Sequence, residues 1–437
     1  MRIAVIGCGI TGLTAAFELA KQNCKVTIFE SEKNIGGLAQ GFPFHGTNIE
    51  LFYHHIFKTD KNLIRLAQEL GIENNLIWNN SSIGLYWGNE LYPFSTPFDL
   101  LRFSPLSLID KLRLGLVILY LQKKTEWEYF MSVPADTWMR KYCGEKSFKV
   151  IFEPLLKAKF QESYQNISMV WLWARIHTRA NSKEKGDAQE KLGYFKGGFD
   201  VLIKALKENL MLNGASMRLE EKILQITSNK KGSVNIASHL GNYTFDKVLI
   251  TIPSYLFGEL IKHNLSVPKE YIDTLNSIKY IGALCILFTL ERSLNPYYWV
   301  NINDPNSPFV VFIEHTNLIS KKYYGGKHVY YLGTYISNDH PFFSMNNNEI
   351  YTEFFNYLTK LFPSFSAKEV LEKHVFKCKN AQHIVDIDYT HKIPDYRTPL
   401  ENVYLSNFSQ IFPEDRGVNF AVREGEKISC LILNNQK

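Results

Sequence analysis

The hydrophobic and polar positions of the first thirty residues predict a strand, a turn, a helix and a second strand. Residues 3–6 form a short apolar run, and residues 13–20 repeat apolar side chains at helical spacing. Residues 25–29 predict a second strand, with Val26, Ile28 and Phe29 as its apolar positions, and Glu30 follows at its end. The turn between the first run and the helix reads Gly7-Cys8-Gly9-Ile10-Thr11-Gly12. This order predicts a βαβ unit with a dinucleotide-binding turn.

Each glycine of this turn has a separate physical role. Gly7 permits the tight turn, Gly9 lets the backbone approach a pyrophosphate, and Gly12 allows the helix to pack closely on the sheet. The helix N-terminus then directs unpaired N–H groups at phosphate, and Glu30 accepts hydrogen bonds from the adenosine ribose. A glycine turn without a nucleotide is the alternative. The candidate dinucleotide-binding residues are Gly7, Gly9, Thr11, Gly12, Glu30 and Ser31.

A second glycine pair follows in the run Asn34-Ile35-Gly36-Gly37-Leu38. With these motifs the sequence resembles the superfamily of FAD-dependent amine oxidases, protoporphyrinogen oxidases, phytoene desaturases and UDP-galactopyranose mutases. The resemblance implies FAD as the cofactor, with Gly36, Gly37 and Leu38 at its pyrophosphate. Many amine oxidases have Arg where this chain has Leu38, which counts against a straightforward amine oxidase.

Two later segments extend the resemblance. Residues 402–428 predict a strand, a polar loop and a final helix. In the superfamily such a helix directs its N-terminus at the pyrimidine ring of the flavin, which implies that Arg416, Gly417 and Asn419 contact FAD. The helix dipole there favours the negative charge of reduced flavin; a capped surface helix is the alternative. In residues 193–226, the resemblance places the backbone of Ile223 at adenine.

The separated motifs predict an α/β fold. A discontinuous, Rossmann-like FAD-binding domain is expected from residues 1–80, 190–265 and 395–437. Residues 81–189 have helical periodicity and are expected to form a helical insertion. Residues 266–394 alternate in the manner of strands. They are expected to form an inserted mixed-sheet substrate domain, largely antiparallel, as the floor of a substrate chamber.

Candidate substrate and catalytic residues lie between the cofactor motifs. Trp171, Arg175 and Arg179 share one face of a predicted helix and suit a carboxylate, a diphosphate or a sugar nucleotide. The alternative is a solvated helix with its tryptophans in the core. His54 and His55 are candidates for a general base, although neighbours in a strand point to opposite faces and a structural role is the alternative. Lys159 is the third catalytic candidate.

Composition limits the partners and the location. The 437 residues carry a net charge of +6 without long basic runs, which argues against nucleic acid and is compatible with an anionic small molecule or membrane surface. The six single cysteines have no metal-ligand spacing, so no metal site is expected. With no signal-peptide pattern, they favour reduced thiols in the cytoplasm. Residues 102–124 mix apolar and basic side chains, which suits peripheral membrane contact or, alternatively, a partly buried helix pair with a basic edge. The longest apolar run, residues 114–121, is too short to span a membrane.

The resemblance implies an FAD-dependent oxidoreductase whose small-molecule substrate, anionic or lipophilic, loses a hydride to flavin N5. This reaction gives a C=C or C=N bond. The first alternative is a redox-neutral sugar-nucleotide mutase resembling UDP-galactopyranose mutase. The second is a non-catalytic lipid carrier resembling Rab GDP-dissociation inhibitors.

Overall fold

The computed structural model describes residues 1–182, 190–228 and 232–434. Five strands from distant parts of the chain form one parallel sheet. They are β1 (Arg2–Ile6), β2 (Lys25–Phe29), β9 (Ser216–Arg218), β13 (Lys247–Ile250) and β19 (Val403–Leu405). Their order in the sheet is β19-β13-β1-β2-β9. β1 is the central strand, and the first glycine turn follows its C-terminal end.

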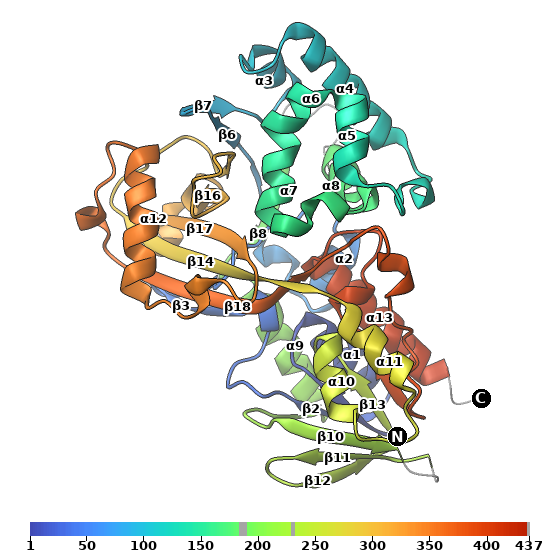
Figure 1. The fold of residues 1–437 in the computed structure, drawn as a ribbon. Helices are drawn as coiled ribbons and strands as arrows, with labels where there is room; N and C mark the ends of the chain where they lie inside the picture. The colour runs from blue at the N-terminus through green and yellow to red at the C-terminus, as the bar shows by residue number, and fades with distance from the viewer. Residues whose placement is uncertain (183–189, 229–231, 435–437) are drawn as a thin grey trace.

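Both faces of this sheet are covered. The side chains of β1 alternate between the two faces, and each set packs in a separate hydrophobic core. Ile3 and Val5 pack with the helices α1 (Ile10–Lys21), α9 (Asp200–Leu212) and α13 (Val418–Asn434). Ala4 and Ile6 pack on the opposite side. That side is covered by the antiparallel strands β10 (Ile223–Ser228), β11 (Val234–Ser238) and β12 (Asn242–Phe245), and by α10 (Ser254–Ile261) and α11 (Lys269–Ser277) (Figure 1).

The first and last helices lie in close contact at a glycine. A Cβ on Gly425 of α13 would lie 2.7 Å from the Thr14 Cβ and 2.9 Å from the Thr11 carbonyl oxygen of α1. Only glycine permits this approach. The packing therefore fixes α13, and the loop that precedes it, relative to the dinucleotide turn.

A second, seven-stranded sheet lies beside the first. Its order is β18-β14-β17-β16-β15-β6-β7, antiparallel except for the parallel pair β15 and β6. The strands are β6 (Ile83–Trp87), β7 (Glu90–Pro93), β14 (Tyr280–Leu290), β15 (Trp299–Ile302), β16 (Val311–Glu314), β17 (His328–Ile336) and β18 (Lys373–His383).

Each face of the seven-stranded sheet has its own cover. Helix α12 (Asn347–Leu361) packs on the face that carries Phe288 and Tyr330. The opposite face, with Leu287 and Tyr331, packs toward the nucleotide-binding part. The elements between them are β3 (Gly41–Phe44), β4 (Thr47–Glu50), α2 (Lys61–Glu69), β5 (Leu76–Asn80) and β8 (Lys191–Phe195).

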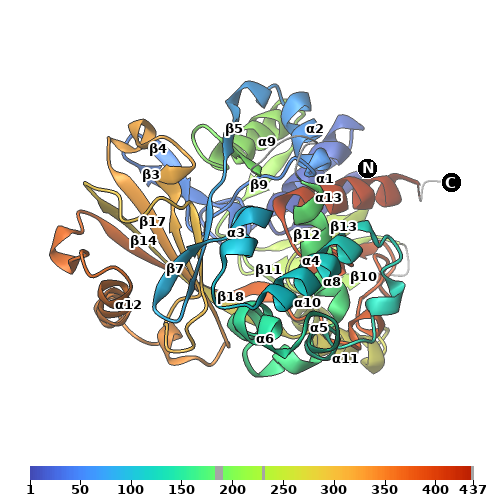
Figure 2. The ribbon, with the colours of Figure 1, turned by 90° about the horizontal axis from the view of Figure 1, so that it is seen from above.

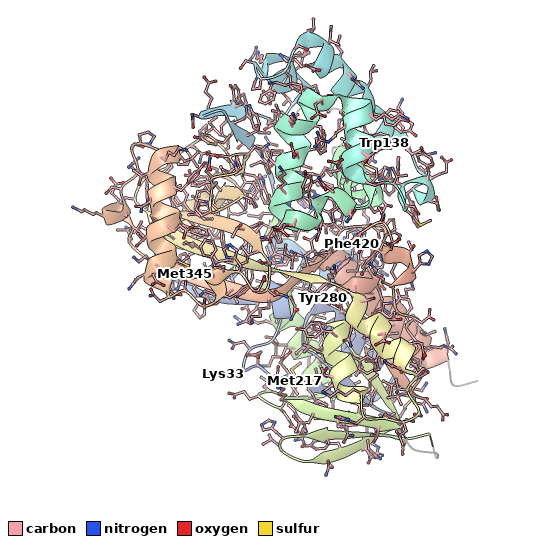
Figure 3. All side chains as sticks on the ribbon, viewed as in Figure 1. Lys33, Trp138, Met217, Tyr280, Met345 and Phe420 are labelled. Carbon is pink, nitrogen blue, oxygen red and sulfur yellow. The ribbon has the colours of Figure 1, made fainter. Side chains whose placement is uncertain are left out.

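Six helices form a separate layer with its own core. They are α3 (Pro97–Arg102), α4 (Leu108–Lys123), α5 (Ala135–Cys143), α6 (Glu145–Ser147), α7 (Glu153–Phe160) and α8 (Met169–Asn181). Figure 2 looks onto this layer, with α3 and α4 nearest the viewer. In Figure 3, Trp138 lies inside the layer and Phe420, near the start of α13, lies below it. The base of the helical layer therefore faces the loop before α13.

The predicted α/β fold is confirmed. The domain boundaries stay a prediction, with one detail added: β6 and β7 join the seven-stranded sheet, so the helices of the predicted insertion begin at α3. The closing helix begins at Val418, whereas its apolar pattern predicts a start at Ala421. Among the described residues, no helix is long and apolar enough to cross a membrane.

Candidate active site

The dinucleotide turn has the geometry that its sequence predicts. Gly7 has φ +106°, and a Cβ on Gly12 would lie 2.2 Å from the Gly7 carbonyl oxygen, so neither position accepts a side chain without strain. A Cβ on Gly9 would meet nothing within 4 Å. Gly9 is therefore a glycine that the protein's own packing does not require, which fits a position where a ligand approaches the backbone.

The acidic residue at the end of β2 lies beside the same turn. The backbone N–H of Cys8 donates to Glu30 Oε2 at 2.9 Å, and Ser31 Oγ lies 3.2 Å from Glu30 Oε1. The backbone N–H of Glu32 donates to that same oxygen at 3.1 Å. These contacts hold the carboxylate at the C-terminal edge of the sheet, as ribose recognition requires.

The second glycine pair touches the first turn directly. The Gly36 N–H donates to the Cys8 carbonyl oxygen at 2.8 Å, and a Cβ on Gly37 would lie 3.2 Å from the Gly9 Cα. Both glycines have positive φ, +110° and +57°. Two backbone segments that carry no side chains thus border one space, which fits a pyrophosphate. The half-buried Leu38 follows in a short 3₁₀ turn.

A group of charged and polar side chains, here named the Asp415 cluster, lies at the base of α13. Asp415 accepts from Arg175 Nη1 at 2.5 Å and from Gln382 Nε2 at 3.3 Å, and its Oδ2 is 3.7 Å from Lys159 Nζ. Lys159 also donates to Gln382 Oε1 at 3.1 Å. The members come from α7, α8, β17, β18 and the loop before α13, and are Lys159, Arg175, Tyr335, Gln382, Asp415 and Arg416.

Tyr335 lies between two cations of the Asp415 cluster. Its hydroxyl is 3.4 Å from Lys159 Nζ and 3.3 Å from Arg416 Nη2. Burial would raise its pKa, but the positive charges of Lys159 and Arg416 outweigh burial and lower the pKa to about 8. A tyrosine with such a pKa is partly ionised near neutrality. It can therefore exchange a proton with a bound molecule.

The other members of the cluster respond to the same charges. Burial would raise the pKa of Asp415, but Lys159, Arg175 and Arg416 hold it well below its usual range. Burial lowers the pKa of Lys159, and Tyr335 and Asp415 oppose that shift. Three cations surround one carboxylate, and the loop leads into the N-terminus of α13. The region is therefore suited to negative charge.

Several buried polar atoms in or beside this cluster have no hydrogen-bond partner among the described residues. Such atoms are costly to bury unless a ligand or water satisfies them. His383 is 1% exposed, its ring stacks on Tyr389 and Phe408, and both of its ring nitrogens are unpaired. The others are Trp171 Nε1, Glu414 Oε2 and Arg416 Nε. Trp171 contacts Lys159 and Arg175, and Arg416 contacts Tyr335, so the unpaired nitrogens of Trp171 and Arg416 indicate a site for a bound molecule at the cluster.

The predicted substrate-binding helix face is divided by the structure. Trp171 is fully buried, and the Arg175 guanidinium lies 5.1 Å from its ring centre. Arg179, one turn further along α8, lies 3.7 Å from Glu190 instead. Arg175 is therefore a member of the Asp415 cluster and Trp171 contacts it, whereas Arg179 pairs elsewhere. The substrate-binding role of all three stays a prediction.

The two histidines lie in the loop after β4. His54 Nδ1 is 2.6 Å from the Phe52 carbonyl oxygen, and His55 Nδ1 is 3.3 Å from the Tyr298 hydroxyl. Burial lowers the pKa of His54 to about 4 and that of His55 to about 3. Both rings are therefore neutral at pH 7. No hydrogen bond among the described residues joins either histidine to the Asp415 cluster, and their catalytic role stays a prediction.

The remaining predicted cofactor residues are placed by secondary structure. Ile223 begins β10 and is buried. Asn419 lies in the first turn of α13, where its Oδ1 accepts from the Leu63 N–H at 3.1 Å. Gly417 is exposed, and the Ala421 N–H donates to its carbonyl oxygen at 2.9 Å. Contact of these residues with FAD stays a prediction.

Sequence reasoning missed three members of the cluster. Tyr335 and Gln382 lie in strands of ordinary apolar alternation, and no motif marks either of them. Asp415 directly precedes the predicted Arg416, so a charged pair in the closing loop was a signal that could have found it.

Comparison with known proteins identifies the family. A profile described as "Flavin containing amine oxidoreductase" matches residues 10–429, nearly the whole chain. The chain belongs to the flavin-containing amine oxidoreductase family. This flavoprotein is an oxidoreductase, and its cofactor is FAD. The expected resemblance is thus confirmed. The open space at Gly9, the adjoining glycine pair and the position of Glu30 all fit this cofactor.

Individual relatives of this flavoprotein have different activities. A coproporphyrinogen III oxidase from Staphylococcus aureus is 25% identical over 58% of this chain, and the matched part is 61% of that relative's length. A zeta-carotene desaturase from Solanum lycopersicum is 23% identical over 99% of this chain and 81% of its own. The crystal structure of a reduced UDP-galactopyranose mutase has a TM-score of 0.77 at 16% identity, covering 100% of this chain and 96% of its own. That last likeness shows the fold alone.

Proposed function

We propose that this flavoprotein dehydrogenates or desaturates a small molecule that carries an anionic group. The observation that carries the proposal is the Asp415 cluster, in which three cations surround one carboxylate beside unpaired buried donors. Lys159 and Arg175 both reach the cluster from the helical layer, and Arg175, whose guanidinium lies over the buried Trp171, is assigned to the substrate. Arg416 precedes α13 and is assigned to the cofactor side.

The reaction removes a hydride and a proton from neighbouring atoms of the substrate. FAD, when bound, supplies the acceptor for the hydride. We assign the proton to the Tyr335 oxygen, since its pKa of about 8 suits a general base near neutral pH. Lys159 stabilises the phenolate from 3.4 Å and is a positioning residue in this scheme. Trp171 and the base of α8 exclude water from the same space.

The relatives support a redox reaction that gives an unsaturated product. The named activities of the two curated relatives are oxidation and desaturation. Their substrates are not transferred to this chain, because identity is low. A C=C or C=N bond is the expected product class.

Anaerobic titration of the oxidised FAD-loaded protein tests the proposal. Carboxylate-bearing amines, porphyrinogens and polyenes would be added in turn, and the visible flavin absorbance followed. A substrate bleaches the flavin in the wild type, and Arg175→Met weakens its binding about tenfold or more, since one charge-assisted contact is lost. Bleaching that is unaffected in Arg175→Met would contradict the assignment of the anionic group to Arg175.

A redox-neutral sugar-nucleotide mutase is the second candidate. Arg175 over the buried Trp171 also suits a diphosphate, and this observation favours it. A mutase requires reduced flavin. If a UDP-sugar perturbs only the dithionite-reduced protein and no ligand bleaches the oxidised form, the mutase replaces the dehydrogenase. A non-catalytic carrier has no support from the family match.

A further inference from the structure

The outermost helices of the helical layer expose an unusual amount of apolar surface. Of the 17 large hydrophobic side chains that are exposed among the described residues, eight lie on α3 and α4. Phe98 is 73% exposed, Ile109 78% and Leu116 69%. The others are Leu101, Leu108, Leu112, Leu119 and Tyr120. Scattered single exposures are normal, but a contiguous patch of this kind marks an interaction surface.

The exposed side chains of α4 follow one stripe. Leu112, Leu116 and Leu119 recur at spacings of four and three residues, so they share a face. The buried Leu114 and Leu121 lie on the opposite face, against the rest of the layer. Figure 1 shows α3 and α4 at the upper end of the molecule, and Figure 2 shows them outermost from above. The stripe therefore faces away from the protein.

The charges on this pair of helices are unequal in sign. Five basic residues lie on or directly after the two helices: Arg102, Lys111, Arg113, Lys123 and Lys124. Lys111 donates to the Leu101 carbonyl oxygen at 2.8 Å and Arg113 to the Tyr142 carbonyl oxygen at 2.7 Å, while Lys124 pairs with Glu126. Arg102 and Lys123 are exposed at the ends of α3 and α4. The two acidic residues, Asp99 and Asp110, are both engaged in capping boxes at the helix N-termini, with Thr96 and Ser107. The patch is thus apolar with a basic border.

We propose that α3 and α4 dock this protein on the surface of a membrane that contains anionic lipid. An amphipathic helix of this kind buries its apolar side chains among the acyl chains and places its basic side chains at the headgroup phosphates. A second copy of the chain fits less well, because a two-fold contact would set each basic border against its own copy. The helices lie in the interface, and α4 has only 16 residues.

Vesicle flotation of the FAD-loaded protein tests docking. Vesicles of phosphatidylcholine mixed with phosphatidylglycerol would be compared with phosphatidylcholine alone, at low and high salt. The wild type is expected to float with the mixed vesicles and to be released by salt. Leu112→Glu with Leu116→Glu should lower the bound fraction about tenfold or more, since two leucines leave the acyl region and two negative charges enter.

The matched control places the same two charges elsewhere. Leu240 and Leu265 are 65% and 104% exposed in the nucleotide-binding part, so Leu240→Glu with Leu265→Glu should float like the wild type. Arg102→Gln with Lys123→Gln should weaken binding to the vesicles that contain phosphatidylglycerol and leave binding to phosphatidylcholine vesicles unchanged. All these positions are exposed, so flavin absorbance and unfolding temperature should be unchanged.

Three results would overturn the proposal. In the first, the wild type binds no vesicles. In the second, the α4 variant binds vesicles as well as its control does. In the third, sedimentation shows that the wild type is a dimer that does not float with vesicles, and that the α4 variant alone is a monomer. The test needs no substrate, so its outcome is separate from that of the proposed reaction.

Discussion

The dinucleotide cradle and the Asp415 cluster are built in different ways. The cradle consists of backbone: Gly7, Gly9, Gly36 and Gly37 bring two chain segments together with no side chain between them. The cluster consists of side chains from five separate elements around Asp415. A site made of backbone is determined by a few residues that are close in sequence, whereas a site made of side chains depends on the tertiary fold.

The largest effects should separate packing from ligand contact within the cradle. Gly12→Ala places a Cβ 2.2 Å from the Gly7 carbonyl oxygen, so the protein should lose FAD and unfold at a lower temperature. Gly9→Ala meets nothing within 4 Å and has an ordinary φ of −76°. It should keep the unfolding temperature of the apoprotein but retain little FAD. Flavin content after purification and thermal unfolding of the apoprotein measure the two effects. If Gly9→Ala binds FAD normally, the pyrophosphate does not lie there.

The second effect concerns the single carboxylate of the cluster. Asp415→Asn leaves Lys159 and Arg175 without their counter-charge. The Arg175 and Asp415 side chains are 25% and 17% exposed, so the loss of unfolding free energy should fall below the cost of about 3–5 kcal/mol for a fully buried pair. Denaturant unfolding measures it. Arg175→Met in the Asp415→Asn background should recover part of the loss. Additive losses in this pair would mean that the two residues act independently.

The same carboxylate predicts a pH dependence. Because its folded pKa lies well below its unfolded value, its contribution is fully present above the unfolded pKa and is lost as pH falls through the folded one. The stability gap between wild type and Asp415→Asn should therefore be constant between about pH 5 and 8 and shrink below about pH 4. A gap that grows on acidification would contradict this.

The third effect tests the proton acceptor. Tyr335→Phe should slow flavin reduction by the substrate about 100-fold, as loss of a general base does. In the wild type the rate should rise with pH around the Tyr335 pKa of about 8, and the rise should be absent in the variant. Stopped-flow reduction across pH measures both. Tyr351→Phe, from α12 on the opposite face of the same sheet, is the control. An unchanged profile in Tyr335→Phe would remove Tyr335 from the chemistry.

The contrast explains what the sequence could predict. Gly7, Gly9, Gly12 and Glu30 lie within 24 residues, so their shared site follows from local spacing, and the family match agrees. Arg416 is found only through a resemblance, because its partners are distant in the chain. Tyr335 and Gln382 look like any polar position of a strand. Only the pairing of β14 with β17 and β18 brings them to one place.

The smallest expected effect is on substrate affinity, at Arg179, which the sequence pattern does not distinguish from Arg175. Arg175 and Arg179 lie four residues apart on α8, yet Arg175 donates to Asp415, whereas Arg179 faces Glu190 at 3.7 Å. The Arg179 side chain is 35% exposed and faces the buried Glu190, away from Asp415. Arg179→Met should therefore change substrate affinity less than about threefold, against tenfold or more for Arg175→Met. Flavin-monitored titration of both variants decides this. Equal losses would return Arg179 to the substrate site and extend the cluster along the whole helix face.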